Sequence, residues 1–257
     1  MRSKFLSLAA VAALAAPLAG AEEFRWQGKI APGGAIEVKG VNGAIEASAA
    51  SGGEVEVVAI KKARSSDPAA VKIEVVEHAG GVTICAVYPS RGDRPNECQP
   101  GSGGRMNVRD NDVQVRFDVR VPAGVRFVGR TVNGGIDARS LPDDGEAYTV
   151  NGAIEIEAGG LARAETVNGR IRARLGRADW KDRLQFKTVN GGIVVELPAS
   201  VGAEVEARTV NGDIDTDFPL TVQGRFSKHR LSGTIGGGGR QLDLETVNGG
   251  IELRKAP

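Results

Sequence analysis

The chain has 257 residues, with 33 Lys and Arg against 32 Asp and Glu and a formal net charge of +1. This balance excludes the strongly basic surface that non-specific nucleic-acid binding requires. With 36 Gly and only 2 Trp, 2 Tyr and 7 Phe, the composition favours strands and turns around a core of Val, Ile, Leu and Ala.

The first 21 residues have the order of a secretory signal peptide. Arg2 and Lys4 precede an apolar run at residues 5–16, and a stretch of small residues ends at Ala21. The apolar run is shorter than the about 20 residues that a transmembrane helix needs. Cleavage after Ala21 would lower Lys and Arg from 33 to 31, and the net charge to 31 − 32 = −1. The mature protein is therefore expected to be exported, as a periplasmic, secreted or cell-surface protein that is not transmembrane.

Residues 22–128 are predicted to form an N-terminal β region. Apolar and polar residues alternate in several short stretches, for example at Val71, Ile73 and Val75, and again at Val113 and Val115. Alternation with period two indicates strands with one buried face. We expect this region to be continuous with a repeat region at residues 129–257.

Cys85 and Cys98 are the only cysteines, and they bracket a polar segment rich in Pro, Arg and Gly. In an exported protein such a pair is predicted to form a disulfide. The segment at residues 89–111 is predicted to be a loop without regular structure. His78 and His229 are the only histidines, so no cluster of metal ligands is predicted.

The repeat region is built on the motif Thr-Val-Asn-Gly-x-Ile. Six full copies begin at Thr131, Thr149, Thr166, Thr188, Thr209 and Thr246, and a copy without the Thr begins at Val41. A degenerate copy at residues 231–235 has Ser232 in place of the Asn. Repeats at such spacings are typical of stacked units that complete one another's core.

Each repeat is interpreted as one coil of a parallel β-solenoid. Counted from the motif Thr as position zero, positions −4, −2, 1, 5 and 7 are mostly apolar, so the inward face is predicted to change phase at a corner at the Thr. Position eight carries Arg139, Glu157, Arg174, Glu196 and Asp217 in successive full copies. Mostly opposite charges would then be neighbours in a stack. The alternative is an antiparallel β meander or sandwich, in which Asn-Gly forms hairpin turns.

In a solenoid the motif Asn side chains would form a hydrogen-bonded ladder along the stack. The predicted members are Asn42, Asn133, Asn151, Asn168, Asn190, Asn211, Ser232 and Asn248. This role is structural, and no catalytic, cofactor-binding or metal-binding residue is predicted. The alternative function is that of a carbohydrate-active enzyme on a β-helix, for which two carboxylates would have to face each other across a cleft. The candidates are Asp137, Glu155, Asp213, Asp215 and Glu252.

The repeats, the Val121-Pro122 pair before them and the Gly-rich turn before Leu242 resemble a family of bacterial exported proteins known as candidate adhesins. The domain of that family has otherwise unknown function. The resemblance implies an all-β, solenoid-like domain at the cell envelope, with no catalytic residues to carry over. We therefore expect a non-enzymatic, adhesin-like binding or scaffold protein without a cofactor, whose partner is an envelope component, either a glycan or a protein.

Overall fold

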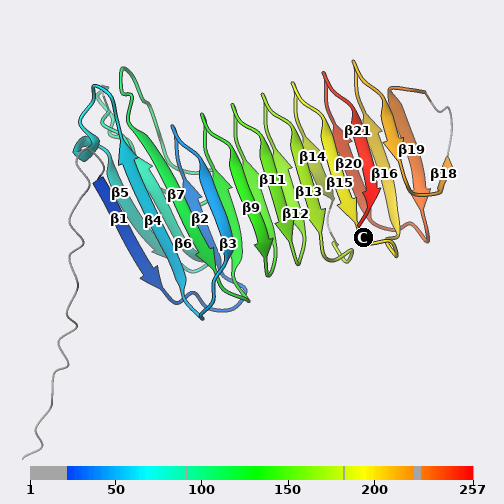
Figure 1. Ribbon diagram of the computed structural model, residues 1–257, viewed down its shortest axis with the longest axis horizontal. Coiled ribbons are helices and arrows are strands. Elements are labelled where there is room, and N and C mark those ends of the chain that lie inside the picture. Colours follow the sequence, from blue (N-terminus) through cyan, green and yellow to red (C-terminus); the bar gives the residue numbers. More distant parts are fainter. Residues whose placement is uncertain (1–21, 91, 182, 223–226, 257) are drawn as a thin grey trace, which may run out of the picture.

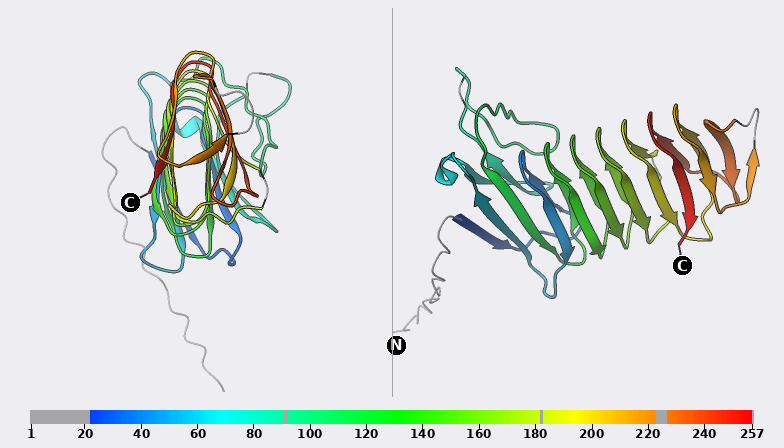
Figure 2. Two further views of the ribbon diagram at one scale, coloured as in Figure 1. Left: turned by 90° about the vertical axis from the view of Figure 1, so that its right-hand side faces the viewer. Right: turned by 45° about the horizontal axis from the view of Figure 1, so that its top comes forward.

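The computed structural model describes residues 22–90, 92–181, 183–222 and 227–256. In them the chain forms an elongated stack of β coils, with two facing sheets that run the length of the molecule (Figure 1). Seen along the stack, the two sheets form two walls with the core between them (Figure 2). The predicted signal peptide at residues 1–21 lies outside the described residues.

In the described residues, seven coils make up the body of the stack. Each coil has one strand in the first sheet, a turn that contains the Asn-Gly pair, and one strand in the second sheet. The coils, in their order along the stack, are β2 (Ala35–Lys39) with β3 (Ile45–Ala49), β8 (Arg126–Arg130) with β9 (Ile136–Leu141), β10 (Gly145–Tyr148) with β11 (Ile154–Ala158), β12 (Ala162–Glu165) with β13 (Ile171–Leu175), β14 (Leu184–Lys187) with β15 (Ile193–Leu197), β20 (Gln241–Glu245) with β21 (Ile251–Lys255), and β16 (Ala203–Arg208) with β17 (Ile214–Thr216). Neighbouring coils pair in parallel in both sheets, so the predicted parallel solenoid is confirmed.

Antiparallel strands extend the stack at both ends. At the N-terminal end the strands are β1 (Glu22–Gly28), β4 (Val55–Lys62) and β7 (Gln114–Val121) in the second sheet, and β5 (Lys72–His78) and β6 (Gly81–Val87) in the first, with a 3-10 turn η1 (Pro68–Ala70) before β5. At the other end β18 (Leu220–Val222) and β19 (Arg230–Ile235) continue the first sheet beside β16. β6 and β7 pair in parallel with β2 and β3 of the first coil, so antiparallel pairing begins beyond them at the N-terminal end and beside β16 at the other.

The coils do not stack in the order of the chain. The β20–β21 coil, which follows the β16–β17 coil in sequence, lies between that coil and the β14–β15 coil (Figure 1). Our expectation that successive copies are neighbours is wrong here. Glu196 and Asp217 would be like charges in direct contact if their coils were adjacent, whereas Arg254 now lies between them and its guanidinium is 3.4 Å from the Asp217 carboxylate.

Asp112 ties the end of the long loop, residues 88–113 between β6 and β7, to the turn that precedes η1. Its carboxylate accepts hydrogen bonds from the backbone N–H groups of Ser66 at 2.8 Å and of Ser65 and Arg64 at 3.0 Å. Hydrogen bonds from Ser66, and from the backbone of Ser65 and Arg64, hold the pKa of Asp112 well below its usual range.

We expect Asp112→Asn to lower the melting temperature at neutral pH and to have less effect in acid. Because the folded-state pKa of Asp112 is lowered, its contribution is fully present above the unfolded pKa of about 4 and is lost as the pH falls toward the folded value. Thermal melts of both proteins between about pH 2 and pH 7 measure this. A difference in melting temperature that stays constant down to the lowest pH would contradict the assignment.

Candidate functional site

The Thr-Val-Asn-Gly turns line one long edge of the solenoid, where the first sheet passes into the second. The motif Thr side chains point inward: all six are buried, with exposed fractions of 1–7%. Each hydroxyl donates to the carbonyl oxygen of the motif Gly in the neighbouring coil, as Thr188 Oγ1 does to Gly169 O at 2.9 Å. Alternation in the first sheet therefore continues through the Thr, and the corner lies in the residues that follow it. This corrects the predicted corner at the Thr.

The motif Asn side chains lie in one hydrogen-bonded row along this edge. In each pair the Nδ2 group of one Asn donates to the Oδ1 atom of the previous one, at 2.7–3.0 Å. The order along the stack is Asn42, Asn133, Asn151, Asn168, Asn190, Asn248 and Asn211. Six amide hydrogen bonds thus link seven coils side by side.

Ser232 is not a member of this row. It lies in β19, which runs antiparallel to β16, and its partner across the pair is Glu206. A strand of opposite direction cannot place this residue at the repeat corner, so the degenerate copy at residues 231–235 is not a coil. The predicted membership of Ser232 in the row is therefore wrong.

The motif valines form an exposed line beside the Asn row, which we call the valine row: Val132, Val150, Val167, Val189, Val247 and Val210. Val189 is half-buried, and the other five are 36–62% exposed. The predicted core position of these valines is wrong, because the buried Thr takes the inward position. Neighbouring members are about 4.8 Å apart along the stack, and their β-branched side chains are stiff.

One end of this line is covered by the long loop. Val41, the equivalent residue of the first coil, is only 9% exposed. A cavity of about 200 Å³ remains between the loop and the edge, and it is lined by Val41, Val132, Met106, Arg105 and Arg130, among others. The valine row therefore begins where this loop ends.

The loop is held by a disulfide and by two charged residues of β2. Cys85 and Cys98 are joined, with their Cα atoms 5.7 Å apart. Lys39 Nζ donates to the carbonyl oxygens of Gln99, Gly101 and Gly103 at 2.8–2.9 Å. The buried Glu37 carboxylate accepts from the Gly101 N–H at 2.8 Å.

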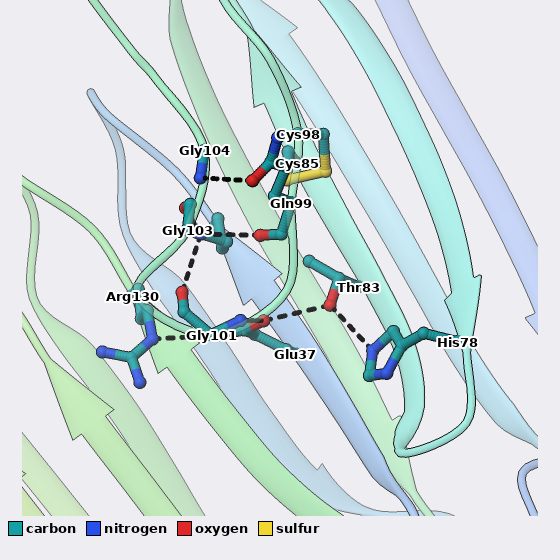
Figure 3. Close-up of a disulfide and its surroundings, with 11 residues drawn as sticks. Glu37, His78, Thr83, Cys85, Cys98, Gln99, Gly101, Gly103, Gly104 and Arg130 are labelled. Atoms are coloured by element: carbon teal, nitrogen blue, oxygen red, sulfur yellow. Dashed lines mark hydrogen bonds and ion pairs between the residues drawn. A yellow bond between two sulfur atoms is a disulfide. The ribbon is translucent and has the colours of Figure 1, made fainter.

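Glu37 also joins the loop to the rest of the first sheet (Figure 3). Arg130 Nε and Thr83 Oγ1 both donate to its carboxylate, at 2.8 and 3.0 Å. The Thr83 hydroxyl is in turn 3.2 Å from His78 Nε2. Because every oxygen of this buried carboxylate has a partner, the group serves to fix the loop.

The candidate carboxylates of the enzyme alternative do not form an opposed pair. Asp137 and Glu155 both accept from Arg139 at 2.7–3.0 Å, and Glu252 is held by Arg254 at 2.8 Å. Asp213 is exposed beside β17, and Asp215 is exposed within it.

A different pair, which sequence analysis missed, lies across β16 and β20. Glu206 and Asp243 are partners there and line a 260 Å³ hollow. Burial raises the pKa of Asp243, although Arg183 stands 2.8 Å away, and the hydrogen bond from Arg208 lowers the pKa of Glu206. Nothing in the repeat pattern distinguishes these two acids from the others, since only the stacking order brings them together.

We expect Asn190→Ala to destabilise the fold more than Asn211→Ala. Asn190 makes two ladder bonds, to Asn168 and Asn248, whereas Asn211 ends the row with one, to Asn248. At about 1 kcal/mol for each lost bond, the losses should be about 2 and 1 kcal/mol. Urea unfolding measures both. Equal losses would mean that the second bond of Asn190 adds nothing, and no loss for Asn190→Ala would mean that the row adds nothing to stability.

The described residues contain no helix that is long and apolar enough to cross a bilayer. By sequence, no curated protein matches the chain. Among solved structures it is similar to a candidate cell adhesion protein from Clostridium sporogenes ATCC 15579, at 13% identity and a TM-score of 0.49, over 92% of this chain and 100% of that one. It is also similar to a candidate adhesin from Bacteroides fragilis NCTC 9343, at 11% identity and a TM-score of 0.38, over 90% of this chain and 97% of that one.

Most of the coil stack matches the model of one protein family. The matched segment, residues 135–254, begins just before β9 and ends within β21, so it takes in all the repeats after the second coil's turn. The resemblance inferred from the repeats is confirmed. Residues 135–254 of the chain match the model of the family Toastrack DUF4097.

Proposed function

We propose that this is an exported, non-enzymatic, adhesin-like binding or scaffold protein, and that the valine row is the surface that contacts its partner. The observation that carries the proposal is the row itself: five valines, each 36–62% exposed, stand in a line on one edge. Contiguous exposed apolar side chains are typical of interaction sites.

The structure of the edge supports this role. On one side of the row the Asn side chains are hydrogen-bonded to one another, and beneath it the Thr hydroxyls are bonded to backbone carbonyls of the next coil. Side chains held on such a rigid frame lose little conformational entropy when they bind. The chain is poor in aromatic residues, which are the usual platforms for sugars, so we infer that the partner is a protein of the envelope.

Two features support export to the periplasm, the cell surface or the medium. The disulfide between Cys85 and Cys98 is of the kind that persists in oxidising compartments. The order of charged, apolar and small residues before Glu22 is that of a signal peptide. Fractionation of the native cell with an antibody to the protein tests the compartment, and retention in the cytoplasm would overturn this part of the proposal.

We expect the triple variant Val150→Ser, Val167→Ser and Val247→Ser to lose binding without losing the fold. If each exposed Val contributes about 1 kcal/mol, the three together change Kd about 100-fold. The measurement is retention of an envelope extract on the immobilised protein, followed by titration of the retained component. Val194→Ser is the matched control, because Val194 is a half-buried valine on the outer face of β15, away from the row. Equal binding by the triple variant and wild type would exclude the valine row.

The enzyme alternative has one observation in its favour, the opposite pKa shifts of Glu206 and Asp243 in a shared hollow. A glycosidase needs one protonated and one ionised carboxyl group. Both acids are nevertheless ion-paired, Asp243 to Arg183 and Glu206 to Arg230 at 3.1 Å. We therefore expect no turnover of envelope polysaccharide. Turnover that disappears in both Asp243→Asn and Glu206→Gln would replace the binding proposal with the enzyme.

A further inference from the structure

The β20–β21 coil occupies a slot whose two walls come from earlier parts of the chain. One wall is the β14–β15 coil and the other is the β16–β17 coil. Leu242, Leu244, Ile251 and Leu253 of the inserted coil are buried in the slot, with exposed fractions of 0–1%. Asn248 completes the Asn row between Asn190 and Asn211.

The chain enters this coil through one glycine-rich linker, residues 236–240, which crosses the start of β16. Three of its glycines have positive φ angles of 54°, 69° and 90°. The crossing is close: a Cβ atom on Gly202 would lie 3.2 Å from the carbonyl oxygen of Gly238. The Glu204 N–H donates to the Arg240 carbonyl at 2.7 Å. Among the described residues, the coil is otherwise held by the walls of the slot and by Trp180, whose indole N–H donates to the Gln241 carbonyl oxygen at 3.0 Å.

We propose that this slot also binds the β20–β21 coil of a second copy of the chain, so that two copies exchange their coils. Every contact in the slot is the same whichever chain supplies the coil, and only the linker favours the coil of the same chain. Exchange of an identical element between copies is a low-cost route to a dimer. The proposal does not depend on the valine row, which lies on the edge of the stack.

The slot selects this coil by charge and by size. At position eight it requires a cation between Glu196 and Asp217, and Arg254 supplies it. In the first sheet Leu244 lies between Phe186 and Ala207. The β10–β11 coil has an acid, Glu157, at position eight, and the small Ala147 at the repeat position that Leu244 occupies in the inserted coil, so it would fill the slot poorly. A second copy of this chain therefore fits the slot better than an unrelated strand pair.

Exchange is expected during refolding rather than between folded molecules. Removing the coil exposes four buried side chains, at about 1.5–3 kcal/mol each, so a folded molecule releases it rarely. During refolding the slot is filled either by its own coil, at the high effective concentration that a short linker provides, or by another chain. The exchanged fraction should rise with the protein concentration during refolding.

A cysteine cross-link detects the exchange. Val194 in β15 and Glu252 in β21 are partners across the parallel pair on the outer face of the second sheet. The full-length chains Val194→Cys and Glu252→Cys, with the native disulfide intact, are refolded together and oxidised at several concentrations. We expect a disulfide-linked heterodimer on a non-reducing gel. The matched control is Asp137→Cys with Glu252→Cys, because Asp137 lies in β9, which does not contact β21. Equal yields from the two mixtures would overturn the proposal.

Shortening the linker provides a second test. Deletion of residues 237–239 leaves three Cα–Cα steps between β19 and β20, about 10 Å when fully extended, to span two strand spacings of about 4.8 Å each and to pass around β16. The coil can then enter the slot of another chain only, and we expect a folded dimer by light scattering. Gly237→Ser keeps the length, and its Cβ would meet nothing within 4 Å, so this control should remain a monomer. A folded monomer from the deletion variant would overturn the proposal.

Discussion

Gly169→Ala is expected to lower the free energy of unfolding by about 3 kcal/mol. A Cβ atom at Gly169 would lie 2.0 Å from the carbonyl oxygen of Gly152 and 2.5 Å from its carbonyl carbon. Both atoms belong to the backbone of the neighbouring coil, which cannot rotate away as the end of a side chain can. Overpacking in a well-packed core costs about 1–3 kcal/mol, and a clash with backbone in the middle of a stack should lie at the upper end.

The repeat position that follows the motif glycine supplies the control for this variant. Gly135 follows a motif glycine, and a Cβ there would lie 3.1 Å from a single atom, the carbonyl oxygen of Ala153. Ala44 and Ala153 occupy the same repeat position in other coils. Gly135→Ala should therefore change stability by less than about 0.5 kcal/mol in urea unfolding. Similar losses for both variants would show that the close approach of the motif glycines does not limit the stack.

The architecture was predictable because the repeat has to satisfy the same stacking contacts in every coil. The spacing of the motif and the alternation of apolar residues are enough to predict parallel coils, and the structure has them. The sequence led to the wrong prediction of which side chain, Thr or Val, points into the core, because an apolar Val is the expected core residue. The positions before the Thr, such as Leu184 and Phe186, already point to Thr188 as the next buried residue. A Thr can take that position because its hydroxyl finds a carbonyl partner.

The order of the coils depends on contacts that the repeat itself does not encode. Each coil can stack on any other through the same Asn, Thr and Gly contacts, so only the variable residues decide which coils are neighbours. Glu196 and Asp217, like charges in consecutive copies, were the available signal that another coil separates them. The exposed fractions of the valine row also depend on contacts that the repeat does not encode. The motif fixes the valines on the edge, but their exposed fractions depend on which loop covers them, as at Val41.

Replacing both cysteines, in Cys85→Ala with Cys98→Ala, is expected to cost about 3 kcal/mol of unfolding free energy. The disulfide closes a loop with a sequence separation of 13 residues. In the chain-entropy model a loop of this length contributes about 3 kcal/mol by restricting the unfolded chain. Guanidinium unfolding of the double variant measures the loss. A loss below about 1 kcal/mol would mean that the unfolded chain is already restricted in this segment.

Lys39→Met separates the two ways in which the loop is held. It keeps the disulfide but removes the three bonds to the carbonyl oxygens of Gln99, Gly101 and Gly103. Burial lowers the pKa of Lys39, so part of the gain from these bonds is offset by desolvation of the ammonium group. The loss of global stability should therefore be smaller than that of the double cysteine variant. Trypsin should nevertheless cleave faster after Arg105, because these bonds hold the loop in the folded state, whereas the disulfide acts mainly on the unfolded chain.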